Sequence, residues 1–291
     1  MAIRPIDIEK FIELSEQHPV LDVRSPGEFD HAHIPGAISF PLFSNEERKE
    51  VGTAYKQQSR EQAIKIGLDF FGPKMRAMVE QAENISSTSE SRTLLVHCWR
   101  GGMRSGGVAW LLDLYGFKVH TLVGGYKSFR RWVLSQFEKE YPLRLVGGYT
   151  GSGKTDLLVA LHDKREAVLD LEGLAHHKGS AFGSIGQPDQ PTQEQFENKL
   201  ALALRKSMTD HPKRLWVEDE SQRIGRVNVP HLFWQQMRRS QVLFLDIPFE
   251  SRLKYIIQGY GTLDALRLVE DRKSTRLNSS HVWISRMPSS A

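Results

Sequence analysis

Residues 94–105 read Leu-Leu-Val-His-Cys-Trp-Arg-Gly-Gly-Met-Arg-Ser and contain the only cysteine among the 291 residues of the chain. The apolar run predicts a strand that ends at Cys98, and a loop with two glycines follows it. Backbone N–H groups of such a loop can turn inward around the sulfur, and Arg104 can close the ring. The stretch therefore predicts a thiolate nucleophile in an anion-binding loop, with Cys98, Arg100 and Arg104 as the candidate catalytic residues.

A lone cysteine after an apolar run is, in most sequences, a small buried hydrophobic residue. A core cysteine has no need of Gly101-Gly102 or of two arginines within six residues. A thiol of low pKa needs such surroundings, because amide dipoles and positive charge favour the thiolate. We therefore favour the catalytic interpretation of Cys98.

Length and composition indicate an ordinary globular protein of about two domains. Hydrophobic residues make up 40% of the chain and charged residues 25%, and a single cysteine excludes an internal disulfide framework. The first residues do not resemble a signal peptide, and no apolar run approaches the length of a membrane span. We expect a cytoplasmic protein with no membrane partner. The sequence does not indicate its oligomeric state.

The net charge of +4 arises from residues 272–291, which carry four Lys or Arg and no acid. The rest of the chain holds 35 basic and 35 acidic side chains, so bulk charge indicates nothing about nucleic acid. Residues 272–291 have neither helical nor strand periodicity and look like translated sequencing-adapter or other non-native sequence. We predict a non-native tail there and exclude it from the fold.

The first half of the chain alternates between short apolar runs and helical patterns. Strands are expected at residues 19–24, 37–40, 94–98 and 119–123, and helices at 6–14, 46–84 (with breaks at Gly67 and at Gly72-Pro73) and 108–115. This alternation predicts an α/β fold with a parallel sheet, in which reactive loops lie at the carboxyl ends of strands. Cys98 occupies such a position.

The second half begins with an apolar run into the pattern G-x-x-x-x-G-K-T and an apolar helix at 157–161. This is a P-loop in its proper context, where glycines let the backbone wrap a diphosphate, a lysine neutralises its charge and a threonine can hold Mg²⁺. An ordinary glycine-rich turn would not be expected between this strand and this helix. The predicted diphosphate-binding residues are Gly148, Gly151, Gly153, Lys154 and Thr155.

Two later strands, at 214–221 and 242–248, fit the sheet of a P-loop domain, and the first ends in Glu218, Asp219 and Glu220. One of these acids could serve at the metal side of the P-loop, and the sequence does not decide which; a solvated strand end is the alternative. Between the P-loop and these strands lies a glycine-punctuated segment, 168–183, in which we predict a substrate loop rather than a zinc site, because two adjacent histidines alone are a poor metal ligand set. Its candidate residues are Asp170, Glu172, His176 and His177.

Residues 5–135 resemble a rhodanese domain. The resemblance rests on Leu21-Asp22-Val23-Arg24, on Glu28-Phe29 with His33-Ile34-Pro35-Gly36-Ala37, and on the strand that ends at Cys98. It implies that the cysteine carries sulfur or a related chalcogen. The loop is one residue longer than usual, because Arg104 follows the cysteine by six positions instead of five, and a wider ring suits a larger anion. His97-Cys98-x5-Arg104-Ser105 also matches the cysteine-phosphatase signature, a less favoured alternative that would need a general acid as well.

A rhodanese domain with this long loop, fused to a P-loop domain that contains the segment 170–183, resembles the tRNA 2-selenouridine synthase family. The resemblance covers about residues 1–270 and implies a rhodanese-like domain (1–138) followed by a P-loop NTPase-like α/β domain (139–271). Members of the family continue beyond residue 271, so the P-loop domain is expected to be incomplete. They replace the sulfur of wobble 2-thiouridine in tRNA with selenium from selenophosphate, through an S-geranyl intermediate made with geranyl diphosphate.

The resemblance implies selenotransferase and geranyltransferase activity, with tRNA, selenophosphate and geranyl diphosphate as partners, no tightly bound cofactor and Mg²⁺ as an optional addition. Two alternatives remain: a P-loop kinase or NTPase with a rhodanese or cysteine-phosphatase-like module, and a non-catalytic tRNA-binding scaffold. For RNA binding, residues 126–132 interleave three cations with three aromatic rings, as phosphate contact and base stacking require. An equally weighted alternative is a linker helix with Phe129, Trp132 and Val133 buried.

Overall fold

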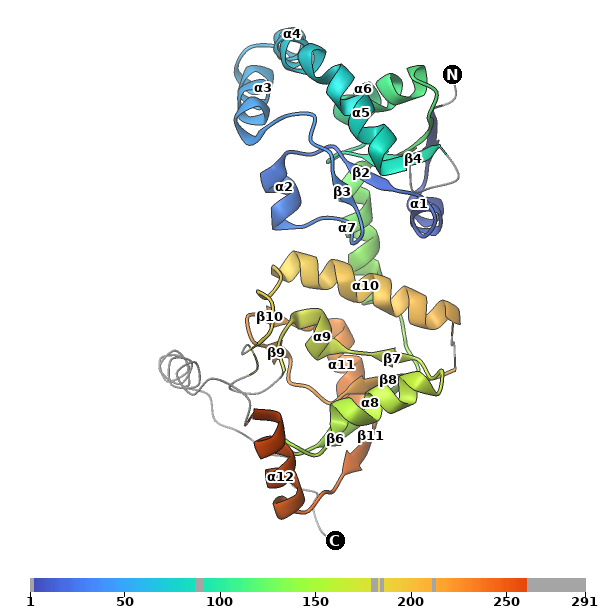
Figure 1. The fold of residues 1–291 in the computed structure, drawn as a ribbon, viewed down its shortest axis with the longest axis vertical. Coiled ribbons are helices and arrows are strands. Elements are labelled where there is room, and N and C mark those ends of the chain that lie inside the picture. The colour runs from blue at the N-terminus through green and yellow to red at the C-terminus, as the bar shows by residue number, and fades with distance from the viewer. Residues whose placement is uncertain (1–2, 87–91, 179–182, 184–185, 211–212, 261–291) are drawn as a thin grey trace. The chain divides into compact units, whose positions relative to one another are not determined.

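The computed structural model describes residues 3–86, 92–178, 183, 186–210 and 213–260 (Figure 1). The chain groups into two compact units, one of residues 1–140 with 192–206 and one of residues 141–191 with 207–291. The segment 192–206 thus belongs to the first unit, although the sequence analysis included it in the P-loop domain. The predicted tail, 272–291, lies outside the described residues.

The first unit contains a five-stranded sheet in the order β1-β5-β4-β2-β3, with every neighbouring pair parallel. This confirms the predicted parallel α/β architecture, and β4 lies at the centre of the sheet. The strands are β1 (Arg4–Ile6), β2 (Val20–Asp22), β3 (Ile38–Ser39), β4 (Thr93–His97) and β5 (Lys118–Leu122). The helices of this unit are α1 (Ile8–Ser15), α2 (Pro26–His31), α3 (Asn45–Gln57), α4 (Arg60–Phe71), η1 (Gly72–Lys74), α5 (Met75–Ser86), α6 (Met103–Leu114), α7 (Gly125–Gln136) and α10 (Gln193–Asp210) up to residue 206.

Local capping explains where the helices of the segment 46–84 begin and end. The break predicted at Gly72-Pro73 is confirmed by η1, but the break predicted at Gly67 is wrong, because Gly67 lies inside α4. The chain breaks instead before α4, where the Ser59 side chain accepts a hydrogen bond from the Gln62 N–H and so satisfies a free donor of the helix. The Ser59 cap thus decides where α4 begins, and the weak helix propensity of Gly67 alone does not break the helix.

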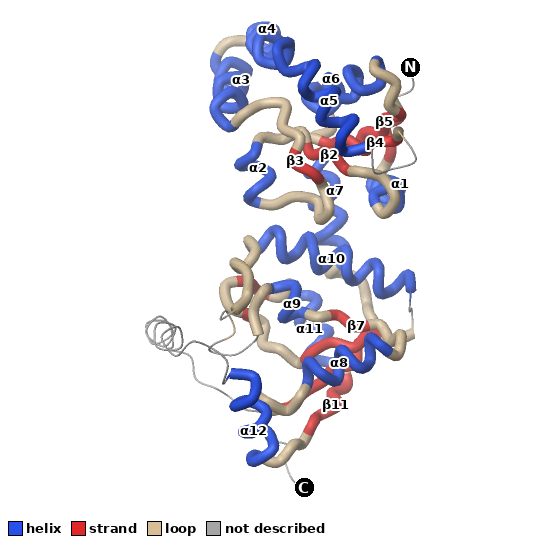
Figure 2. The backbone as a smooth tube through the Cα atoms, viewed as in Figure 1, coloured by secondary structure: helices blue, strands red, loops and turns tan. Residues whose placement is uncertain are grey.

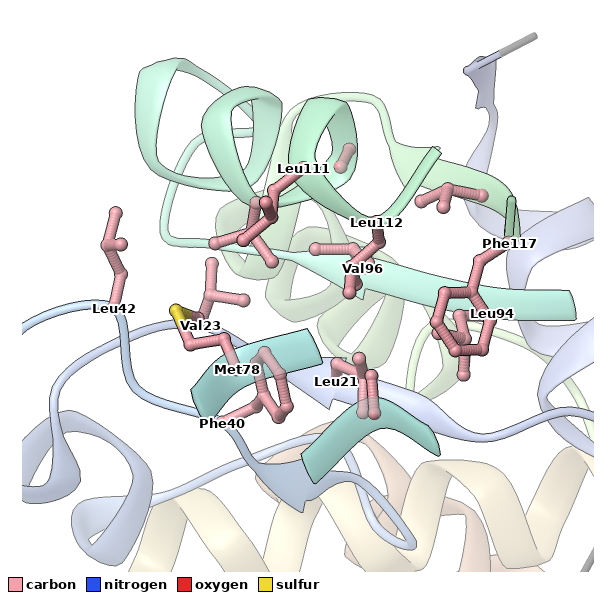
Figure 3. Close-up of a cluster of buried hydrophobic side chains, with 14 of the residues drawn as sticks. Leu21, Val23, Phe40, Leu42, Met78, Leu94, Val96, Leu111, Leu112 and Phe117 are labelled. Carbon is pink, nitrogen blue, oxygen red and sulfur yellow. The ribbon is translucent and has the colours of Figure 1, made fainter. Parts of the chain in front are cut away.

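A buried apolar cluster fills the space on one side of this sheet (Figure 3). It combines Leu94 and Val96 of β4 with Leu21 of β2, Met78 of α5 and Leu112 of α6. Cys98 belongs to the same cluster and is only 3% exposed. The core therefore fixes the end of β4, and with it the start of the cysteine loop.

The second unit contains a four-stranded sheet in the order β11-β6-β8-β7, again with parallel neighbours, and a two-stranded antiparallel hairpin. Figure 2 shows the strands in red and the helices in blue. Its strands are β6 (Leu143–Gly148), β7 (Val168–Leu169), β8 (Leu215–Glu218), β9 (Arg223–Ile224), β10 (Val227–Asn228) and β11 (Gln241–Leu245). Its helices are α8 (Lys154–Asp163), α9 (Leu171–Ala175), α11 (His231–Arg239) and α12 (Phe249–Tyr260). In the described part of the chain, no helix has the length and apolar character that crossing a membrane requires.

Candidate functional site

Backbone hydrogen bonds join the loop after β4 to the start of α7. The Tyr126 N–H donates to the Cys98 carbonyl oxygen (2.8 Å), and the Lys127 N–H donates to the Trp99 carbonyl oxygen (3.0 Å). Gly101 and Gly125 have φ angles of +65° and +58°, which only glycine adopts without strain. A Cβ at Gly125 would lie 2.3 Å from the Cys98 carbonyl oxygen, so the close approach of the two segments requires glycine as well.

The Cys98 sulfur lies inside a ring of hydrogen-bond donors. Its distance to the Ser105 Oγ is 3.2 Å, and Ser105 is itself buried at the start of α6. Burial raises the pKa of the Cys98 thiol, but hydrogen bonds from the Ser105 side chain and from the backbone N–H groups of Ser105, Gly102 and Arg100 favour the thiolate more strongly, so the pKa lies below its ordinary value. The loop can thus present a thiolate and bind an anion with the same amides.

The side chain of Arg104, which is predicted to close the ring around the sulfur, is paired with an acid in the structure. The Arg104 guanidinium donates to the Glu28 Oε2 (2.8 Å), and Arg100 is exposed. Glu28 also accepts a hydrogen bond from the Ser25 N–H in the capping box of α2, and Arg48 lies 3.5 Å from it. Glu28 is not among the predicted site residues, although Ser25-x-x-Glu28 before a helix is a capping signal that could have identified it.

A layer of buried polar groups lies next to the loop. Arg24 is 1% exposed, binds the Asp22 carboxylate through two nitrogens and places its Cζ 3.9 Å from the centre of the Tyr126 ring. The Tyr126 hydroxyl donates to Glu194 (2.7 Å) and accepts from Asn198 (2.9 Å), both on α10. Helix α10 is therefore bound to Tyr126, which directly follows Gly125 at the start of α7.

The segment 126–132 lies in helix α7, and the aromatic side of this segment is buried. Phe129 is fully buried and Trp132 is 6% exposed, so neither ring can stack on an RNA base. Arg130 binds Glu197 (2.5 Å) and Asn198 (2.6 Å) on α10. Of the three cations, Lys127 and Arg131 are exposed. The base-stacking interpretation of this segment is therefore wrong, because the core needs the rings.

The P-loop connects β6 to α8, as predicted. Gly148, Gly151 and Gly153 all have positive φ, and a Cβ at Gly148 would lie 2.4 Å from the Ser152 Oγ. The Lys154 ammonium donates to the Gly148 carbonyl oxygen (3.1 Å), so it stays folded onto the loop at the beginning of α8, and Thr155 follows it. The backbone N–H groups at this helix N-terminus and the Lys154 charge make the loop suitable for a diphosphate.

Carboxylates from two other elements converge on the P-loop lysine. The Glu172 N–H donates to the Glu218 Oε2 (3.4 Å), and the charge of Glu220 acts on the Glu172 carboxyl. Burial, together with the neighbouring carboxylates, raises the pKa of Glu218 to about 9 and that of Glu172 to about 7. Asp219 forms an ion pair with Arg238, and its charge also acts on Glu220. Among the described residues, no group of three or more His, Cys, Asp or Glu is arranged to hold a metal ion.

The four candidate residues of the predicted substrate loop have different surroundings in the structure. Asp170 caps α9 by accepting from the Gly173 N–H (2.7 Å), so its role is at least structural. His176 adopts a left-handed conformation (φ 51°), and its Nδ1 lies 2.9 Å from the Asp189 carbonyl oxygen. A Cβ at Gly225 would lie 2.7 Å from the His177 ring, which therefore faces the β9–β10 turn. Residues 179–182 of this loop lie outside the described residues.

Fold and site together define a class: a rhodanese-like domain with a thiol-bearing anion loop, joined to a P-loop domain. Comparison with family models agrees, since a rhodanese-like domain model matches residues 7–131 and a tRNA 2-selenouridine synthase AAA domain model matches residues 141–284. The second match includes part of the predicted tail. The first match, which includes Cys98, favours the rhodanese interpretation of the loop over the cysteine-phosphatase one.

Three relatives, each named tRNA 2-selenouridine synthase, extend the comparison over both domains. The chain is 37% identical over 246 residues to that of Shewanella halifaxensis (84% of this chain, 66% of the relative) and 38% identical over 250 residues to that of Shewanella piezotolerans (85% and 67%). It is 38% identical over 249 residues to that of Nitrosomonas europaea (83% and 63%). The chain therefore belongs to the tRNA 2-selenouridine synthase family, and it spans about two thirds of the length of these relatives.

The solved structures similar to this chain include an N-terminal domain described as that of an ATP/GTP binding protein from Clostridium difficile 630. It shares 40% sequence identity, with a TM-score of 0.42, and the match covers 46% of this chain and 99% of that chain.

Proposed function

We propose that this protein takes part in replacing the sulfur of wobble 2-thiouridine in tRNA with selenium from selenophosphate, through an S-geranyl intermediate made with geranyl diphosphate. Membership of the family supports the overall reaction. The observation that carries the proposal is the presence, in one chain, of a thiol of lowered pKa inside an amide ring and of a P-loop with its lysine. Each site is suited to bind an anion: the Cys98 loop to bind selenophosphate, and the P-loop to bind geranyl diphosphate.

In the geranylation step, the thiocarbonyl sulfur attacks C1 of geranyl diphosphate, the C1–O bond breaks, and the diphosphate leaves with the electron pair. The leaving group is therefore where negative charge develops, and Lys154 with the loop amides is suited to stabilise it. If Mg²⁺ accompanies the diphosphate, the Thr155 hydroxyl is the P-loop group that would hold it, and the ion would neutralise phosphate charge. In the selenium step, the Cys98 loop binds the selenophosphate anion. The selenium attacks C2 of the S-geranyl base, the C2–S bond breaks and geranyl thiolate leaves. Water then cleaves the P–Se bond and releases phosphate.

Two variants of a full-length protein separate these roles. Lys154→Ala should abolish geranylation and leave plain 2-thiouridine, because the charge that neutralises the leaving diphosphate is lost. Cys98→Ala should still geranylate, so it should accumulate S-geranyl-2-thiouridine and form no 2-selenouridine. Nucleoside analysis of tRNA after incubation with each variant measures both outcomes. Normal formation of 2-selenouridine by Cys98→Ala would refute the thiolate role.

A P-loop kinase or NTPase with a rhodanese module is the second candidate, because P-loops bind nucleotides more often than prenyl diphosphates. Nucleotide hydrolysis and geranyl diphosphate binding can be measured on the same sample. Robust ATP turnover without binding of the diphosphate lipid would favour this candidate.

For the tRNA partner, the exposed cations of α7 provide the test. Replacing Lys127 and Arg131 together by Ala should weaken tRNA binding and reduce its salt dependence, because each lost phosphate contact removes counterion release. Arg130→Ala is not equivalent, since Arg130 is held by α10. An unchanged salt slope in the double variant would leave α7 as a linker only.

A further inference from the structure

Three exposed aromatic rings, those of Tyr149, Phe244 and Phe249, form an aromatic cluster next to the P-loop. Tyr149 is part of the loop, and Phe249 begins α12. Phe244 lies at the carboxyl end of β11, where it is in register with Gly147, the residue of β6 that comes just before the loop. Tyr149 is 58% exposed, Phe244 51% and Phe249 62%. Phenylalanine is among the residues most often buried, so this cluster is a candidate binding surface.

Arg252 of α12 joins the cluster to the P-loop. Its Nη1 donates to the Thr150 carbonyl oxygen (3.2 Å), and its Nε donates to the Ile247 carbonyl oxygen (3.0 Å). Its Cζ lies 4.9 Å from the centre of the Tyr149 ring and 5.6 Å from that of Phe249. A positive charge is thereby held where the loop and the rings meet, which favours a ligand with an anionic head group at this position.

Helix α12 also packs against the loop itself. A Cβ at Gly151 would lie 2.7 Å from the Ile256 Cγ1, so the contact is close. Exposed aliphatic side chains extend the apolar area on both elements, Val242 on β11 and Ile257 on α12. Ligands of parallel α/β sheets bind at the carboxyl ends of the strands, where β6 and β11 present the loop and Phe244 together. A ligand held by the loop would therefore have an apolar surface beside it.

The geometry of the cluster favours a hydrocarbon chain over a flat base. The Tyr149 and Phe244 rings are perpendicular, with centres 5.4 Å apart, so they do not form a slot of parallel faces in which a base would stack. A hydrocarbon needs no hydrogen-bond partner and gains only from apolar area that leaves water. We propose that the aromatic cluster binds the hydrocarbon tail of a prenyl diphosphate whose diphosphate lies in the P-loop. This inference rests on the proposed role of the P-loop as the diphosphate site.

The test compares ligands that share a head group and differ in the length of the tail. Calorimetric titration of a full-length protein with geranyl diphosphate and with the shorter dimethylallyl diphosphate, at one fixed Mg²⁺ concentration, measures the contribution of the tail. The wild type should bind geranyl diphosphate at least about tenfold more tightly, because more apolar area leaves water. The heat capacity change on binding should also be more negative for the longer ligand.

Two variants assign this preference to the cluster. Phe244→Ala and Phe249→Ala should each weaken the binding of geranyl diphosphate about fivefold and reduce the preference for the longer tail. Both should bind inorganic pyrophosphate as the wild type does, because neither side chain belongs to the loop. Tyr55→Ala is the matched control, since Tyr55 is an aromatic residue of similar exposure on α3. It should retain all wild-type affinities.

The outcomes separate this inference from the proposed function. A wild type that binds pyrophosphate but does not prefer the longer tail would overturn the inference alone. So would an unchanged preference in both phenylalanine variants, including the case in which they lose stability because the rest of the full-length chain covers the cluster. Weaker binding of ATP, with unchanged binding of both prenyl diphosphates, would overturn it in favour of a base-stacking surface. If the wild type binds neither pyrophosphate nor a prenyl diphosphate, with or without Mg²⁺, the diphosphate site itself is refuted, and the inference with it.

Discussion

Gly101 and Gly125 lie so close together that a Cβ on Gly125 would stand 2.4 Å from the Gly101 backbone nitrogen. This contact joins the cysteine loop to the start of α7, and two backbone hydrogen bonds next to it fix the same geometry. The amides that point at the Cys98 sulfur are therefore held by packing from behind, which is how a scaffold makes a loop rigid enough for chemistry.

The first prediction concerns this contact. Gly125→Ala should lower the free energy of unfolding by about 2 kcal/mol or more, because the new Cβ collides with backbone atoms at a residue with positive φ. Gly116→Ala is the control, since Gly116 also has positive φ but a Cβ there meets nothing within 4 Å. Urea unfolding of both variants measures the difference. Equal destabilisation would mean that backbone strain alone, and not the contact, explains the loss.

The second prediction concerns the thiol. Ser105→Ala removes a hydrogen bond that favours the thiolate, so it should raise the pKa of Cys98. The rate of alkylation by iodoacetamide against pH reads this pKa directly, because Cys98 is the only cysteine of the chain. Ser135→Ala, at a serine that donates to the Trp132 carbonyl oxygen, should leave the profile unchanged. An unshifted profile for Ser105→Ala would show that the backbone amides alone set the pKa.

The third prediction concerns the partner of Arg104. Burial raises the pKa of Glu28, but the hydrogen bond and charge of Arg104, the Ser25 N–H and Arg48 lower it more, so the pKa is depressed overall. A depressed carboxyl pKa stabilises the fold above the unfolded-state pKa, and this stability is lost as the pH falls through the folded-state pKa. Glu28→Gln should therefore cost about 1 kcal/mol at pH 7 and less at pH 3. Urea unfolding at the two pH values decides, and a constant difference would contradict the ion-pair role.

The fourth prediction concerns the attachment of α10. Tyr126→Phe removes the hydroxyl that donates to Glu194 and accepts from Asn198, and should cost about 1–2 kcal/mol because the partners of a buried group lose their hydrogen bonds. Tyr115→Phe is the control, since its hydroxyl donates to Glu83 at an exposed position. Thermal unfolding measures both. An equal, small effect of the two substitutions would mean that α10 is held mainly by other contacts.

The sequence by itself determined the two sheets and the two anion loops, because strand periodicity, glycine positions and the lysine of a P-loop are local signals. It placed Cys98 at the carboxyl end of a buried strand, and Lys154 at the start of a helix, where the structure has them. It also contained the capping signals of Ser25 and Ser59, which decide where helices begin through hydrogen bonds between residues only three positions apart.

Only the tertiary structure decided which charges meet. Arg104 turns to Glu28, 76 residues away in the sequence, and Tyr126 binds Asn198 across 72 residues. The rings of α7 were ambiguous between a stacking surface and a core, because both need the same spacing, and burial settled the question. Glu172 and Glu218, near Lys154, likewise come from segments some 50 residues apart in the sequence. Their raised pKa values depend on proximity and desolvation, which no local pattern contains.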